Sequence, residues 1–168
     1  MDWGIFAIEA IVACALFTLF WVVMAHVGEP VNYIYNYPEP IVDRAVELGL
    51  VKDERDMPRS KAVIIRKSLA ALIIALTFAV LLHFANGAHT FWEGAIASYL
   101  LWLVIDWYDA FVLDICWFCH SSRWVIPGTE DLADAYHDYL FHIRGSAKGM
   151  LLGIPVAIVV GAIVALLG

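Results

Sequence analysis

Residues 149–167 read GMLLGIPVAIVVGAIVALL and contain no charged side chain. A helix needs about 20 mostly apolar residues to cross the hydrocarbon core of a bilayer, and this stretch has about that length. Hydrophobic residues make up 62% of the 168-residue chain, and charged residues make up 16%. Because a soluble domain of this size has too little interior to bury so much apolar surface, the stretch predicts a transmembrane helix.

Three more stretches are long and apolar enough to cross a membrane. They cover about residues 3–25, 68–84 and 91–118. The fold class predicted from these stretches is all-α, an integral membrane bundle of four transmembrane helices. No linker or internal repeat divides the sequence, so we expect a single domain over residues 1–168.

The basic residues predict the direction of the helices. All ten Lys and Arg fall in the two long connections, at about 26–67 and 119–148, and none in the tight turn at 85–90. Loops rich in Lys and Arg stay in the cytoplasm, so both termini are expected outside. Nothing in the sequence directs the chain to an organelle, which favours a bacterial plasma membrane. No basic face lies apart from the membrane flanks, so we expect a lipid bilayer and no nucleic acid as partner.

Each long connection contains a stretch with the pattern of a short amphipathic helix. Apolar residues at 41, 42, 45, 46 and 48 follow Pro40, and Gly49 comes after them. We expect this helix to lie on the inner membrane face. A second short helix is predicted at about 130–143.

Small residues recur every fourth position in the last apolar stretch, at Gly153, Ala157, Gly161 and Ala165. Such a stripe lets two helix backbones approach closely in lipid. It is explained either by packing within one bundle or by an interface between copies of the chain, which would make the protein a homo-oligomer.

The stretch at 91–118 carries three carboxylates, Asp106, Asp109 and Asp114. An Asp at the centre of a membrane helix costs roughly 2.5 to 3.5 kcal/mol on insertion scales. Helical periodicity places Asp106 and Asp109 on one face, and Asp114 roughly 80° to its side at 100° per residue. Such acids share protons, bind a metal, bind a cationic substrate or line a wet cleft. The alternative is a buried hydrogen-bond network with Trp107 and Tyr108.

The face that contains the aspartates leads toward further Asp and His residues on the inner side. Side chains of these types are ligands for Zn, Mn or Fe, so the sequence predicts a divalent metal there. Its candidate ligands are Asp109, Asp114, His120, Asp134, His137, Asp138 and His142. The residues expected to take part in catalysis are Asp106, Asp109 and His137. Those expected to bind substrate are Arg123, Arg144 and Trp102.

Cys116 and Cys119 form a C-x-x-C motif. Membrane thiol oxidoreductases with four-helix cores use such pairs, but no second pair is present here to relay electrons. Metal ligation beside His120 is a second interpretation. The third interpretation is that the two cysteines are small buried thiols.

Two functions of different classes remain open at this stage. The first is a metal-dependent membrane enzyme that acts on an amphiphilic substrate, with its site open to the cytoplasm. The second is a proton- or cation-coupled transporter or channel that uses Asp106, Asp109 and Asp114 as its relay. A haem-binding anchor is less well supported, because the histidines lie near the ends of the apolar stretches. A structural or partner-binding membrane protein is the remaining interpretation.

Overall fold

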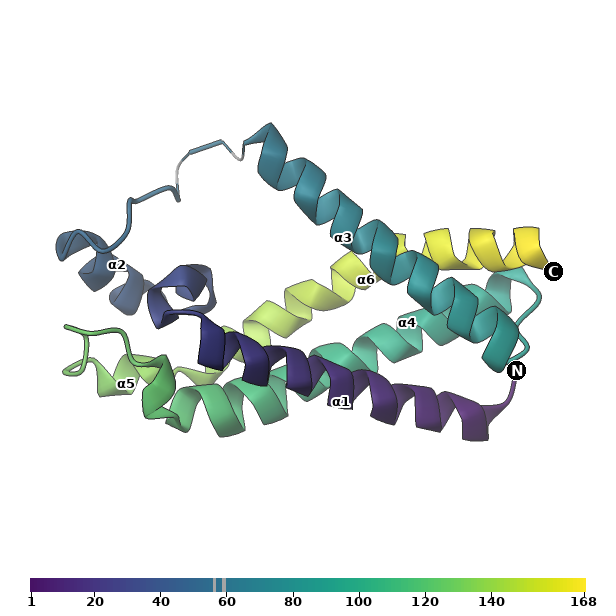
Figure 1. Ribbon diagram of the computed structural model, residues 1–168, viewed down its shortest axis with the longest axis horizontal. Helices are drawn as coiled ribbons and strands as arrows, with labels where there is room; N and C mark the ends of the chain where they lie inside the picture. Colours follow the sequence, from purple (N-terminus) through teal and green to yellow (C-terminus); the bar gives the residue numbers. More distant parts are fainter. Residues whose placement is uncertain (56, 59) are drawn as a thin grey trace. The chain divides into compact units, whose positions relative to one another are not determined.

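The computed structural model describes residues 1–55, 57–58 and 60–168. The described residues are largely helical and include no β-strand. The elements can be followed in Figure 1. They are α1 (Trp3–Val27), η1 (Pro30–Asn36), α2 (Glu39–Glu47), α3 (Lys61–Val80), η2 (Leu81–Ala85), α4 (Phe91–Tyr108), η3 (Asp109–Trp117), η4 (Phe118–His120), η5 (Ser122–Trp124), α5 (Ala133–Tyr136) and α6 (Tyr139–Leu167).

Within the part of the chain that the structure describes, four helical segments are long and apolar enough to cross a membrane. They are Trp3–Val27, Lys61–Ala85, Phe91–His120 and Ala133–Leu167. Many of their large apolar side chains are exposed, as Leu151 is to 67% and Ile11 to 69%. Apolar patches of this extent mark surfaces that contact lipid or protein. The prediction of four long apolar helices is confirmed, and these helices support a membrane location.

The contacts within the chain divide it into two compact units. Unit 1 comprises Met1–Ala15, Pro58–Trp107 and Ala147–Gly168. Its core contains small and aliphatic side chains from α1, α3, α4 and α6 together with Phe78. Leu82, Val160 and Val164 are fully buried there.

The small residues of α6 pack against α4 within unit 1. A Cβ added to Gly161 would come within 2.7 Å of the carbonyl oxygen of Phe91, and one added to Gly153 within 2.5 Å of the Trp102 ring. Ala157 is also buried, whereas Ala165 is exposed. Packing within the chain therefore explains most of the stripe, and an interface between copies stays a prediction.

Unit 2 comprises Leu16–Met57 and Tyr108–Ser146, and its core combines aliphatic side chains with a cluster of aromatic rings. Trp124 lies at the centre of this core. Its ring centroid is 6.1 Å from that of Trp21, 5.7 Å from those of Tyr33 and Trp117, and 5.4 Å from that of Phe118. The Tyr37 hydroxyl donates to the Trp124 carbonyl oxygen at 2.7 Å. Much of the two predicted connections is thus folded into a packed unit.

The apolar side of α2 faces this core. Ile41 and Ala45 have no exposed surface, and Val42 is buried as well. Protein covers these residues, because the aromatic side chains of the same unit pack around them. The position of this helix on the inner membrane face stays a prediction.

The second short helix differs from its predicted bounds of 130–143. At the start of this range only the four residues of α5 are helical. This helix ends at His137, whose φ is -97° and ψ is 19°. The carboxylate of Asp138 then accepts from the backbone N–H of Phe141 at 3.1 Å, as a helix N-cap does. The residues after this cap form one continuous helix, α6, that starts ten residues before the predicted span.

Candidate functional site

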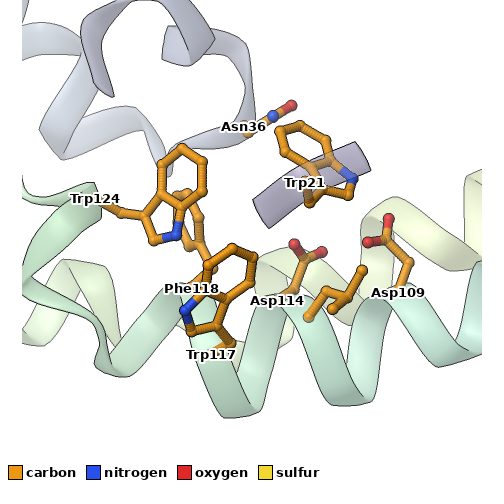
Figure 2. A pocket seen from close by; sticks show the side chains of 8 residues that line it. Trp21, Asn36, Asp109, Asp114, Trp117, Phe118 and Trp124 are labelled. Carbon is orange, nitrogen blue, oxygen red and sulfur yellow. The ribbon is translucent and has the colours of Figure 1, made fainter. Parts of the chain in front are cut away.

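Unit 2 contains a pocket with aromatic walls and two carboxylates. Figure 2 shows Asp109 and Asp114 on the same side of η3, with both carboxylates turned toward Trp21 and Asn36. The side chains come from α1, η1, η3, η4 and η5. The lining residues are Trp21, Asn36, Asp109, Leu113, Asp114, Trp117, Phe118 and Trp124.

The two carboxylates lie on the same side of η3 because this segment is a π-helix. A π-helix makes i→i+5 hydrogen bonds, and single π-turns inside α-helices are frequent at functional sites. Residues five apart, such as Asp109 and Asp114, therefore lie about one turn above each other. The prediction that Asp114 points to the side of the Asp109 face was wrong, because it assumed α-helical periodicity.

Asp114 forms a close pair with His142 of α6. Its Oδ2 lies 3.0 Å from Nδ1 of His142, whose side chain is only 4% exposed. The other ring nitrogen of His142, Nε2, is buried and has no hydrogen-bond partner. A carboxylate that holds Nδ1–H orients the imidazole and leaves Nε2 to accept a proton. This is the arrangement of a general base.

Two indole N–H groups at the pocket lack a hydrogen-bond partner. They are Nε1 of Trp21 and Nε1 of Trp124, and both atoms are buried. A buried polar group without a partner is unfavourable by roughly 1 to 3 kcal/mol. The pocket therefore offers hydrogen-bond donors on its aromatic walls and acceptors on η3.

The hydroxyl group that holds Trp124 in place is itself buried. Burial raises the pKa of the Tyr37 hydroxyl, and the neighbouring Tyr136 adds to the rise. Tyr136 accepts a hydrogen bond from the backbone N–H of Ile126 at 2.9 Å. Two buried, hydrogen-bonded phenols thus hold the backbone of Trp124 and Ile126 in the core of unit 2.

Two predicted site residues lie in unit 1 and do not line this pocket. The Trp102 indole donates to the carbonyl oxygen of Gly149 at 3.0 Å. A Cβ on Gly149 would collide with the carboxylate of Asp106. Asp106 therefore packs against Gly149 of α6. Its predicted role in catalysis stays a prediction.

His120 and His137 form a second, exposed pair in unit 2. Their ring centroids lie 5.1 Å apart. Each donates through Nδ1 to a backbone carbonyl, His120 to Ile115 at 2.9 Å and His137 to Ala133 at 2.7 Å. The Tyr139 hydroxyl lies 3.3 Å from Nε2 of His120. Both rings are thus held in one tautomer by the backbone.

The predicted substrate-binding arginines lie outside the pocket lining. Arg123 donates to the carbonyl oxygens of Ala25 and Gly28, the latter at 2.8 Å. Those carbonyls belong to the end of α1, where basic side chains stabilise a helix terminus. Arg144 is exposed on α6. Arg123 thus has a structural role that the sequence did not indicate.

The predicted metal ligands are not gathered into one site. Across residues 1–55, 57–58 and 60–168, no three His, Cys, Asp or Glu side chains are close enough to hold a metal ion. Among the predicted ligands that the structure describes, Asp114 contacts His142, and His120 lies next to His137. Asp134 is exposed. Cys116 is an exposed free thiol and Cys119 a buried one.

The lining residues of the pocket that were not among the predicted site residues are Trp21, Asn36, Leu113, Trp117, Phe118 and Trp124. Trp21 and Trp117 lie near the ends of their apolar stretches, where tryptophans commonly mark the membrane interface, so they did not stand out. Trp124 and Asn36 are far apart in the sequence, and no motif relates them.

No protein-family model, no curated protein and no solved structure matches this chain.

Proposed function

We propose that this chain is an integral membrane protein that binds the polar end of an amphiphilic molecule in the pocket of unit 2. The observation that carries the proposal is the lining of that pocket. Two carboxylates, Asp109 and Asp114, face aromatic walls that contain two unsatisfied indole N–H groups. Binding sites combine apolar walls with a few polar groups in this way, and an ionisable residue within a membrane helix indicates a functional site.

The apolar part of such a molecule would lie along the outside of the same helices. Phe20 and Val23 of α1 and Phe111 of η3 are exposed, to 52%, 44% and 51%. These side chains belong to the same unit as the pocket. With the orientation expected from the basic residues, the pocket lies at the cytoplasmic side and both termini lie outside.

The Asp114–His142 pair would supply proton transfer next to the pocket, which Asp114 lines and His142 does not. Asp114 orients the imidazole through Nδ1, and Nε2 of His142 is then the proton acceptor. An enzyme that activates a hydroxyl group or a water molecule needs such a base. The predicted metal is not part of this proposal.

A second candidate function is proton movement along the same groups. The Asp114–His142 contact joins a carboxylate of η3 to an imidazole of α6, and Asp/His chains form proton relays in membrane proteins. In liposomes with an imposed proton gradient, Asp114→Asn and His142→Gln would each abolish uptake of protons under this alternative. If liposomes that contain the wild-type protein take up protons no faster than empty liposomes, this alternative is excluded.

Co-purifying amphiphiles test the first proposal. The protein is extracted in a mild detergent, and retained molecules are identified by native mass spectrometry and by analysis of the organic extract. We expect a molecule in near-stoichiometric amount with wild type and with Trp92→Phe, whose indole is 70% exposed. It should be lost with Trp124→Phe, which removes one pocket N–H and keeps an aromatic ring. Equal retention by both variants would contradict the proposal.

A further inference from the structure

We infer that His120 and His137 form a two-histidine site for a divalent transition-metal ion that prefers imidazole ligands, with Cu²⁺ bound most tightly. Both residues belong to unit 2, and both are exposed. Neither of them lines the pocket of that unit. The inference therefore goes beyond the proposed function and does not depend on it.

Backbone hydrogen bonds leave Nε2 available as a ligand atom in both rings. Nδ1 of His120 lies 2.9 Å from the carbonyl oxygen of Ile115, and Nδ1 of His137 lies 2.7 Å from that of Ala133. A carbonyl oxygen only accepts, so Nδ1 is the donor in each pair, and in the neutral ring the lone pair lies on Nε2. Histidines that bind a metal usually donate their other ring nitrogen to such a carbonyl or to a carboxylate. Both rings thus have the tautomer and the supporting hydrogen bond of a metal ligand.

The distance between the two rings is suitable for one shared ion. A ring nitrogen about 2.0 to 2.1 Å from a metal ion places the centroid of its ring about 3.2 Å from that ion. With an angle of about 90° to 110° between two such ligands, the centroids lie about 4.5 to 5.2 Å apart. The centroids of His120 and His137 are 5.1 Å apart, which lies within this range.

Tyr139 provides a hydroxyl group beside the pair. Its oxygen lies 3.3 Å from Nε2 of His120, and the two rings are stacked with an interplanar angle of 11°. In the neutral imidazole, Nε2 accepts from this hydroxyl group. The contact is longer than usual for a hydroxyl donor, and a metal ion would replace it as the partner of Nε2.

The ligand atoms select the class of ion. Imidazole nitrogen suits Zn, Cu, Fe and Ni, and among the divalent ions of this row Cu²⁺ has the highest affinity. Ca²⁺ and Mg²⁺ prefer oxygen ligands. A closed structural site has four protein ligands, whereas the described residues bring no three His, Cys, Asp or Glu side chains together. The protein would therefore supply two ligands, and water would take the remaining positions.

The test is a titration of the full chain with Cu²⁺ in detergent, in competition with a chelator of known affinity. The protein is purified without a histidine tag and treated with EDTA beforehand. Both His120→Ala and His137→Ala should weaken Cu²⁺ binding by at least about tenfold, since even the loss of a group that only orients a ligand has an effect of that size. Pulsed electron paramagnetic resonance should detect two imidazoles bound to copper in the wild type and one in either variant.

Two other histidines provide matched controls. His26 is exposed in the same unit, and its Nδ1 also contacts a backbone carbonyl, at 2.7 Å, but among the described histidines none makes a ring contact with it. His89 of unit 1 lies in the other histidine pair, with its ring centroid 5.0 Å from that of His83. His26→Ala and His89→Ala should both leave the ion at His120 and His137 in place.

Each outcome decides for or against the site. A selective loss in His120→Ala and His137→Ala, with unchanged thermal unfolding of the metal-free proteins, supports it. Wild-type affinity in these two variants, or an equal loss in His26→Ala, overturns it. Failure of the wild type to compete with the chelator for Cu²⁺ overturns it as well.

Discussion

At the scale of residues, Tyr37 stabilises unit 2 through the single polar atom of its side chain. Its hydroxyl donates to the buried carbonyl of Trp124 at 2.7 Å, and the side chain is 2% exposed. Tyr37→Phe would leave that carbonyl without a partner, so we expect a loss of about 1 to 3 kcal/mol in the free energy of unfolding. Tyr35→Phe is the control, because Tyr35 is 66% exposed. Thermal unfolding in detergent measures both, and equal midpoints would contradict the assigned role of Tyr37.

The pKa of Tyr37 predicts how stability depends on pH. Burial raises this pKa in the folded state above its usual value, which is about 10 in an unfolded chain. The unfolded state therefore loses its proton first, so the contribution of Tyr37 is complete below about pH 10 and declines as pH rises above that value. Denaturant unfolding at increasing alkaline pH should show this decline. The decline should be smaller in Tyr37→Phe, and an identical decline would refute the assignment.

Metal content tests the predicted ligand set residue by residue. Asp114 pairs with His142, whereas His137 pairs with His120, and no described group joins three of them. Any metal that purifies with the protein should therefore be lost in only one of the variants Asp114→Asn and His137→Ala. Elemental mass spectrometry on protein purified without chelators provides the measurement. Loss in both variants would support the single centre expected from the sequence.

At the scale of elements, the glycines of α6 allow this helix to approach α4 closely. A Cβ on Gly161 would come within 2.7 Å of a backbone oxygen and 2.9 Å of the Ala95 side chain. Gly161→Ala should therefore lower the free energy of unfolding by about 1 to 3 kcal/mol through overpacking.

Gly145 provides the matched control in the same helix. A Cβ there would meet nothing within 4 Å, so Gly145→Ala should be neutral or stabilise the helix by up to about 1 kcal/mol through its higher helix propensity. Thermal unfolding of both variants provides the comparison. A similar effect of the two substitutions would mean that the packing of α6 against α4 is not as close as described.

At the scale of the whole molecule, the predicted orientation follows from the ten basic residues. His89 lies between the two helical segments Lys61–Ala85 and Phe91–His120, and Lys52 lies in the long basic connection. Both positions are exposed. A cysteine introduced at either one, in a variant that lacks Cys14, Cys116 and Cys119, reports on which side of the membrane that position lies. A membrane-impermeant maleimide should label His89→Cys on intact cells and Lys52→Cys only after permeabilisation. The reverse pattern would invert the topology.

The sequence alone determined that the chain has four apolar helices and where its charges lie. Both properties depend on the length and composition of contiguous stretches, and a helix long enough to cross a membrane satisfies its own backbone hydrogen bonds. The bounds of α1 and the start of α4 were therefore close to those predicted. The carboxylates of Asp109 and Asp114, which line the pocket, could be singled out as candidate site residues from the sequence, because charge within an apolar stretch is conspicuous without any structure.

Only the tertiary structure decided how these carboxylates are surrounded. The π-helix at Asp109–Trp117 changes which residues share a face, and sequence periodicity assumes a constant turn. The cap at Asp138 places His142 on α6, where it contacts Asp114. Trp21 and Trp124 meet because two connections fold into one aromatic core. Such contacts between distant parts of the chain depend on packing in three dimensions, and no local pattern in the sequence encodes them.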